Sequence, residues 1–111
     1  LVPVGPSCRV GRCCILCGQV GLAGSVVVED GVMIGGQAGV GDNLRVGARA
    51  KVGARSGVMN DVPAGDTWFG TPAQNAHLAM RNIALLRRLS ARLDEIKARI
   101  KALESERAGL P

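Results

Sequence analysis

The fold is decided by residues 4–63, VGPSCRVGRCCILCGQVGLAGSVVVEDGVMIGGQAGVGDNLRVGARAKVGARSGVMNDVP. An aliphatic residue returns in this stretch every six positions, and the fourth residue after each of them is again small or apolar. The aliphatic positions are Val4, Val10, Leu16, Leu22, Val28, Ile34, Val40, Val46, Val52 and Val58. A period of six is a hexapeptide repeat, and neither an amphipathic helix nor an alternating strand produces it.

A second period of eighteen residues lies on top of the first, because Gly18 aligns with Gly36 and Gln19 aligns with Gln37. Three hexapeptides therefore make one coil, and like residues stack from coil to coil. This pattern predicts an all-β solenoid, a parallel β-helix of triangular section with about three coils, over residues 1–66. With one Trp, one Phe and no Tyr, the chain suits a narrow aliphatic column better than a thick two-layer core.

The size of this prism and the flanking sequence lead to expectations about assembly and compartment. So short a prism is marginal alone, so we expect its flat faces to pack against copies in a closed oligomer. The chain opens at Leu1 inside the repeat, which suggests that an N-terminal part of a longer protein precedes it. No apolar run approaches membrane-spanning length and no signal peptide is recognisable, so a soluble, cytoplasmic protein is expected.

The four cysteines, Cys8, Cys13, Cys14 and Cys17, fall within ten residues, and their spacing invites a zinc interpretation. The repeat opposes it, because Cys8 and Cys14 occupy the small inward position, whereas Cys17 occupies the small position after an aliphatic residue. They are thereby assigned to different walls and cannot converge on one ion. We expect buried free thiols, no metal, no cofactor and a reducing compartment.

Glycine-rich pieces such as residues 36–41 are weak candidates for phosphate binding. A dinucleotide fingerprint must open a helix after a strand, whereas these glycines belong to a repeat whose turns demand them. We therefore assign them a structural role.

The period stops after Pro63, and residues 67–71 are predicted to form an exit loop and helix cap. Trp68 and Phe69 are the only aromatic residues of the chain. They are expected to close the end of the apolar column, or alternatively to line a ligand groove.

A C-terminal α-helix is predicted over residues 72–108. Thr71 is its expected N-cap, with Pro72 at the first helical position and Gln74 completing a capping box. An apolar seam with alternating spacings of three and four is typical of a coiled coil. It consists of Leu86, Leu89, Leu93, Ile96, Ile100 and Leu103. Such a seam must meet either partner helices or the prism, and its mixture of Leu and Ile does not fix the number of strands.

Charge is placed unevenly along the chain. Residues 1–80 carry six basic and five acidic side chains, while residues 81–111 carry eight basic and four acidic. Four arginines precede any acidic residue of the helix, namely Arg81, Arg87, Arg88 and Arg92. They form either a solvated face or a docking site for an acidic partner. Nucleic acid is not an expected partner, because no aromatic interleaving or motif supports it.

Several stretches carry a resemblance to a known family. They are residues 11–25, residues 34–40, the exit motif at residues 56–65, and Gly70 to Ala73. Together they resemble the C-terminal half of bacterial UDP-3-O-acylglucosamine N-acyltransferase, over most of residues 1–90 and without a gap. The resemblance implies a left-handed parallel β-helix, and only the family supplies the hand, since parallel crossovers are usually right-handed. It further implies a homotrimer that transfers a 3-hydroxyacyl chain from acyl carrier protein to the 2-amino group of a UDP-glucosamine derivative in lipid A synthesis.

The same resemblance exposes a departure at the catalytic positions. Where the family has a segment of the type Ile-Gly-His-Asn, whose His is the general base, this chain has Val4 to Ser7, so that Pro6 stands at the base position. A second family His, near the donor and nucleotide, falls at Asn43. Ser7 and Asn43 are thus the implied substrate-binding positions. Gly24 matches the glycine whose backbone N–H is expected to stabilise the oxyanion, and Pro6, Gly24 and Asp42 should form one outward column.

Two hypotheses of function follow from this departure. Proline cannot accept a proton, and the side chain of Asn43 can hydrogen-bond but not titrate. His77, the only His, is expected to be an exposed or packing residue of the helix. The chain is then either an acyltransferase domain with reduced or lost activity, or a non-catalytic trimeric scaffold built from the prism and the coiled coil. For acyl-carrier docking, the candidates are the four arginines Arg81, Arg87, Arg88 and Arg92.

Overall fold

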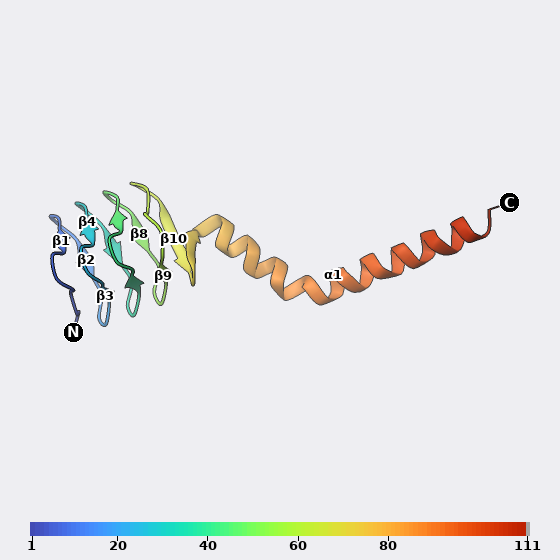
Figure 1. Cartoon of the computed structure of the whole chain (residues 1–111), viewed down its shortest axis with the longest axis horizontal. Coiled ribbons are helices and arrows are strands. Elements are labelled where there is room, and N and C mark those ends of the chain that lie inside the picture. The colour runs from blue at the N-terminus through green and yellow to red at the C-terminus, as the bar shows by residue number, and fades with distance from the viewer. Residues whose placement is uncertain (111) are drawn as a thin grey trace. The chain divides into compact units, whose positions relative to one another are not determined.

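The computed structural model describes residues 1–110 as two compact units, one spanning Leu1–Ala79 and one beginning at Met80. The first unit is a parallel β-solenoid whose strands stack in chain order (Figure 1). Its repeat strands are β1 (Arg9–Val10), β2 (Ile15–Leu16), β3 (Gly21–Leu22), β4 (Val27–Val28), β5 (Met33–Ile34), β6 (Gly39–Val40), β7 (Arg45–Val46), β8 (Lys51–Val52) and β9 (Gly57–Val58). The fold class predicted from the hexapeptide period is confirmed.

Three flat walls make up the solenoid. One wall is β1-β4-β7, the second is β3-β6-β9, and the third contains β2, β5 and β8. Neighbouring strands in a wall are parallel and in register at a separation of eighteen residues, as in the pairs Leu16 with Ile34 and Ile34 with Val52. The coil of three hexapeptides is therefore confirmed.

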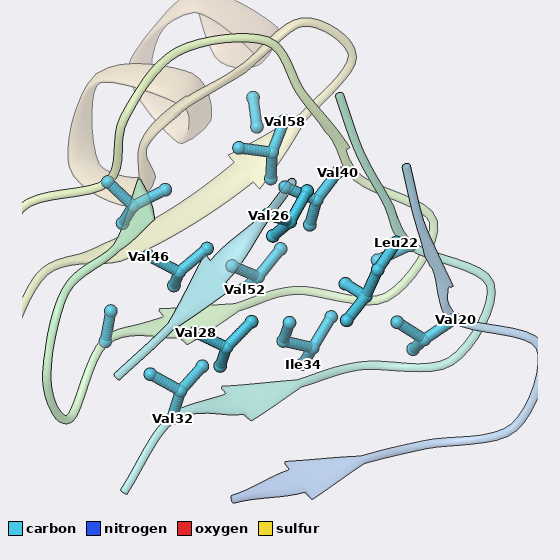
Figure 2. Close-up of a cluster of buried hydrophobic side chains, with 14 residues drawn as sticks. Val20, Leu22, Val26, Val28, Val32, Ile34, Val40, Val46, Val52 and Val58 are labelled. Atoms are coloured by element: carbon cyan, nitrogen blue, oxygen red, sulfur yellow. The ribbon is translucent and has the colours of Figure 1, made fainter. Parts of the chain in front are cut away.

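The inward positions of the repeat form one continuous core. Figure 2 shows these aliphatic side chains, among them Val28, Ile34 and Val52, gathered inside the coils. Ile34 and Val46 are fully buried, whereas Val4 in the first coil is 52% exposed, because no further coil of the described chain stacks below it. The exposed first layer follows from the one-dimensional stacking of a solenoid, in which each coil is covered only by its neighbours.

With the exception of Gly31, the left-handed turn positions at the corners are occupied by residues other than glycine. The left-handed backbone conformation recurs every six residues, at Ser7, Cys13, Gln19, Ser25, Gly31, Gln37, Asn43, Arg49 and Arg55. This conformation normally favours glycine. The backbone N–H of each corner residue from Gln19 onward donates to a carbonyl one coil earlier, as Ser25 does to Pro6 at 2.8 Å. Stacking between coils therefore stabilises a conformation that the side chains disfavour.

Some repeat glycines serve coil packing instead of the turns. A Cβ at Gly35 would lie 2.5 Å from the backbone nitrogen of Ala54, whereas a Cβ at Gly39 would meet nothing within 4 Å. The interpretation that the turns demand these glycines was therefore wrong. Glycine is required after the aliphatic residue where the next coil passes closely over it.

The segment after Pro63 differs from the predicted loop and cap. Residues 67–70 form a strand, β10 (Thr67–Gly70), which pairs with β8 in parallel and with β11 (Ala73–Asn75) in antiparallel orientation. Trp68 packs against the core from β10, and a Cβ at Gly53 would collide with the ring of Phe69. Residues 67–71 are therefore mostly a strand that extends the third wall.

The helix begins later than predicted. Helix α1 (Ala76–Ala108) starts four residues after Pro72, because Ala73 to Asn75 continue the sheet. The N-cap is Asn75, whose side-chain oxygen accepts the backbone N–H of His77 at 3.0 Å. Thr71 instead donates its hydroxyl to the carbonyl of Arg55 at 3.2 Å, so the predicted capping box was wrong. Among the helices of residues 1–110, none is long and apolar enough to cross a membrane.

Candidate functional site: the Pro6 column

The candidate site is one corner of the solenoid, where the turns of successive coils stack. We call it the Pro6 column, and it consists of Pro6, Ser7, Gly24, Ser25, Asp42 and Asn43. Two backbone hydrogen bonds join its turns, from the Ser25 N–H to the Pro6 carbonyl at 2.8 Å and from the Asn43 N–H to the Gly24 carbonyl at 2.9 Å. The structure thus brings together the four residues that the sequence singled out, namely Pro6, Ser7, Gly24 and Asn43.

Pro6 and Asp42 flank Gly24 on either side. A methyl group at Gly24 would lie 3.8 Å from Cγ of Pro6 and 3.6 Å from a carboxylate oxygen of Asp42. The side chain at position 6 therefore lies next to Gly24, one coil below it. Proline has no titratable atom, so no proton acceptor stands at this position of the column.

The backbone N–H of Gly24 is already engaged. It donates to Oδ1 of Asp42 at 2.8 Å, on the exposed surface of the corner. Sequence reasoning placed Asp42 in the column but missed this hydrogen bond. The available signal was an aspartate eighteen residues after the glycine, which is the separation that places a turn residue directly over the one below it.

The Asp42 contact is one of three similar contacts between coils. Asp30 accepts the backbone N–H of Arg12 at 2.7 Å, and Asp61 accepts that of Arg45 at 2.8 Å. A carboxylate that accepts a backbone N–H makes a stronger hydrogen bond than a neutral acceptor does. Each aspartate therefore joins its own coil to the preceding one, and Asp42 does so at the amide assigned to oxyanion binding.

Asn43 and Ser7 occupy the left-handed turn positions of the column, with φ of 59° and 61°. Both are exposed. Their side chains are hydrogen-bonding groups at the surface of the same corner, and neither supplies a base. Their role in substrate binding remains a prediction.

The cysteines are less buried than predicted. Cys8 and Cys14 lie half-buried at the inward position, and their thiols donate to the carbonyls of Ala23 at 2.8 Å and Glu29 at 3.1 Å. Cys13 and Cys17 are exposed, and all four are free. Within residues 1–110, no three His, Cys, Asp or Glu side chains gather closely enough to hold a metal ion.

The remaining predicted site residues lie on helix α1. His77 is exposed in the first turn. Four exposed arginines belong to the second unit, namely Arg81, Arg87, Arg88 and Arg92. The six seam residues are 45% to 70% exposed. A coiled-coil partner and a carrier protein are both compatible with these exposed surfaces, and both remain predictions.

Comparison with known proteins identifies relatives of the chain, although no family model matches it. A UDP-3-O-acylglucosamine N-acyltransferase of Methylobacterium (strain 4-46) is 41% identical over 92 residues, which are 83% of this chain and 26% of that protein. The protein of the same name from Caulobacter (strain K31) is 47% identical over 88 residues, which are 79% of this chain and 26% of that protein. The chain thus spans about a quarter of the length of these curated relatives.

A solved structure supports the fold. A hexapeptide-repeat acetyltransferase from Vibrio cholerae, complexed with acetyl coenzyme A, matches with a TM-score of 0.52 and 21% identity, over 68% of this chain and 65% of that one. At this identity the likeness shows the fold alone. The curated relatives confirm the resemblance that the sequence motifs indicated, and the chain is similar to one part of the UDP-3-O-acylglucosamine N-acyltransferases.

Proposed function

We propose that this chain is the solenoid and helix of an N-acyltransferase whose acyl-transfer activity is strongly reduced. The reaction would be transfer of a 3-hydroxyacyl chain from acyl carrier protein to the 2-amino group of UDP-3-O-acylglucosamine, the substrate in the names of the relatives. The observation that carries the proposal is the position of Pro6 one coil below Gly24, where a methyl group added at Gly24 would lie 3.8 Å from Cγ of Pro6. The general-base position lies next to the glycine whose amide would bind the oxyanion, and it holds a residue that cannot take a proton.

The chemistry of such a transfer explains why Pro6 matters. Attack of an amine on a thioester needs removal of a proton from the amine and stabilisation of the negative oxygen that forms. A base at position 6 and the Gly24 N–H would supply these two functions at adjacent points of the column. Without the base, only substrate binding and the amide remain, and loss of a general base typically costs about 10²- to 10⁴-fold in rate.

Partners and assembly form part of the same proposal. The four arginines named above would attract an acidic carrier protein, since they precede every acidic residue of the helix. The exposed seam would pair with the seams of two further copies in a homotrimer. Four free cysteines fit a reducing compartment, so we place the protein in the cytoplasm, without metal or cofactor.

A non-catalytic trimeric scaffold is the second candidate. It is favoured by the hydrogen bond from the Gly24 amide to Asp42, because this bond is one of three aspartate contacts that join the coils and so would serve stability. In this case the solenoid and the seam would serve assembly alone.

Acyl transfer measured on the intact protein separates the two candidates. The decisive variant carries Pro6→His, Ser7→Asn and Asn43→His together, and we call it the restored variant. We expect the unmodified protein to be nearly inactive and the restored variant to recover measurable transfer from a 3-hydroxyacyl carrier protein. Pro6→Ala is the matched control, since it removes the proline without adding a base.

Two results would contradict the proposal. Family-like transfer by the unmodified protein would show that the base lies elsewhere and that the assignment of Pro6 is wrong. An inactive restored variant that folds and assembles normally would favour the scaffold.

A further inference from the structure

The Gly24 amide has an internal acceptor in the structure. Oδ1 of Asp42 lies 2.8 Å from the Gly24 nitrogen, which is the distance of a full charge-assisted hydrogen bond. A backbone amide has one proton to donate. While Asp42 accepts it, the carbonyl oxygen of another molecule cannot bind there.

Asp42 has no competing cation among residues 1–110. The one ion pair of that part of the chain joins Arg45 to Glu29, with 3.1 Å between nitrogen and oxygen. The negative charge of Asp42 is therefore directed at the Gly24 amide without a neutralising partner. A developing oxyanion at this amide would have to displace a carboxylate and would also be repelled by it.

We propose that Asp42 is an internal occupant of the Gly24 amide and limits acyl transfer at the Pro6 column independently of Pro6. The inference rests on the proposed function, because it concerns the amide assigned to the oxyanion. Two separate features then depress the reaction: the base is missing at position 6, and the donor at position 24 is occupied. Restoring the base alone would recover only part of the activity.

Asp30 provides a matched control for this idea. It accepts the Arg12 N–H at 2.7 Å across the same separation of eighteen residues, but at a different corner. Replacement of either aspartate by alanine removes one exposed hydrogen bond between coils. Both Asp42→Ala and Asp30→Ala should therefore affect coil stacking, whereas only Asp42→Ala should affect the Pro6 column.

The first measurement is amide hydrogen exchange by NMR on the full chain. Asp42→Ala should accelerate exchange at Gly24, and Asp30→Ala should accelerate exchange at Arg12 while leaving Gly24 unchanged. Unchanged exchange at Gly24 in Asp42→Ala would overturn the inference, because the carboxylate would then not hold that proton.

The second measurement is acyl transfer by the intact protein in the restored background. Adding Asp42→Ala should raise the rate by about 10²- to 10³-fold, the usual value of one oxyanion donor, while adding Asp30→Ala should not. A rate that Asp42→Ala leaves unchanged, in a restored variant that is itself active, would overturn the inference. If Gly24 exchanges faster but no variant transfers acyl groups, the occupancy by Asp42 stands and the proposed function fails.

Discussion

The solenoid and the C-terminal part of helix α1 both carry a regular aliphatic repeat, but their aliphatic side chains differ in burial. In the solenoid Ile34 and Val46 are fully buried, because coils of the same chain lie on both sides of them. In the helix Leu93 is 45% exposed and Ile100 is 51% exposed. A solenoid coil is covered by the next coil of its own chain, whereas a seam on a single helix needs another helix. The first unit is therefore covered by its own coils, whereas the seam of the second is exposed in the single chain and would be covered by the association proposed above.

The largest expected effect comes from a charge in the solenoid core. Ile34→Asp places a carboxylate at a fully buried position, and we expect a loss of more than about 5 kcal/mol, comparable with the whole stability of a small domain. Met33→Asp is the control, since Met33 precedes Ile34 in β5 and is 43% exposed. Thermal unfolding followed by circular dichroism checks both. If the two variants melt alike, the assignment of inward and outward positions is wrong.

The next effect concerns the seam. Replacing Leu93 and Ile100 together by Asp should abolish association, at a cost on the order of 3–5 kcal/mol per chain, while the solenoid stays folded. Ala91→Asp with Ala98→Asp adds the same charge to the helix away from the seam and should leave the assembly intact. Light scattering measures the mass of both. An unchanged mass after the Leu93 and Ile100 replacements would show that the seam is not an interface.

The smallest effect tests how closely the coils pack. Gly35→Ala should destabilise the solenoid by about 1–3 kcal/mol, because its Cβ would meet the backbone of Ala54. Gly39→Ala should be nearly neutral, since its Cβ points into open space. Denaturant unfolding of Gly35→Ala and Gly39→Ala measures the difference in their free energies of unfolding. Equal stability would mean that close approach between coils does not explain the glycine at position 35.

The periodic part of the structure could be predicted from the sequence, and the exceptions had to be found in the structure. The six-residue period identifies Ile34 and Val52 as stacked core residues, because in a solenoid the period alone determines which side chains point inward. The segment at Thr71 to Gln74 fits a local helix-start pattern, yet Ala73 and Gln74 belong to strand β11 and pair with β10. Local propensity was overridden there by the free edge of a sheet, which a sequence pattern does not reveal.

In the candidate site, too, one part could be predicted from the period and another part is seen only in the structure. The separation of eighteen residues predicts that Pro6, Gly24 and Asp42 share one column, and the structure places them together. The hydrogen bond from Gly24 to Asp42 depends on the side-chain conformation of one aspartate. Periodicity determines which residues are neighbours but not which of their atoms touch.

The left-handed corners have a consequence for the evolution of such chains. Serine, cysteine, glutamine, asparagine and arginine all occupy the same turn conformation, and the corner amides from Gln19 onward hydrogen-bond to the coil below through backbone atoms. The requirement to fold therefore constrains the residue type at these corner positions only weakly. A lineage can exchange the reactive groups of a column one at a time, and keep, lose or regain a chemical activity, while the architecture that carries them is inherited unchanged.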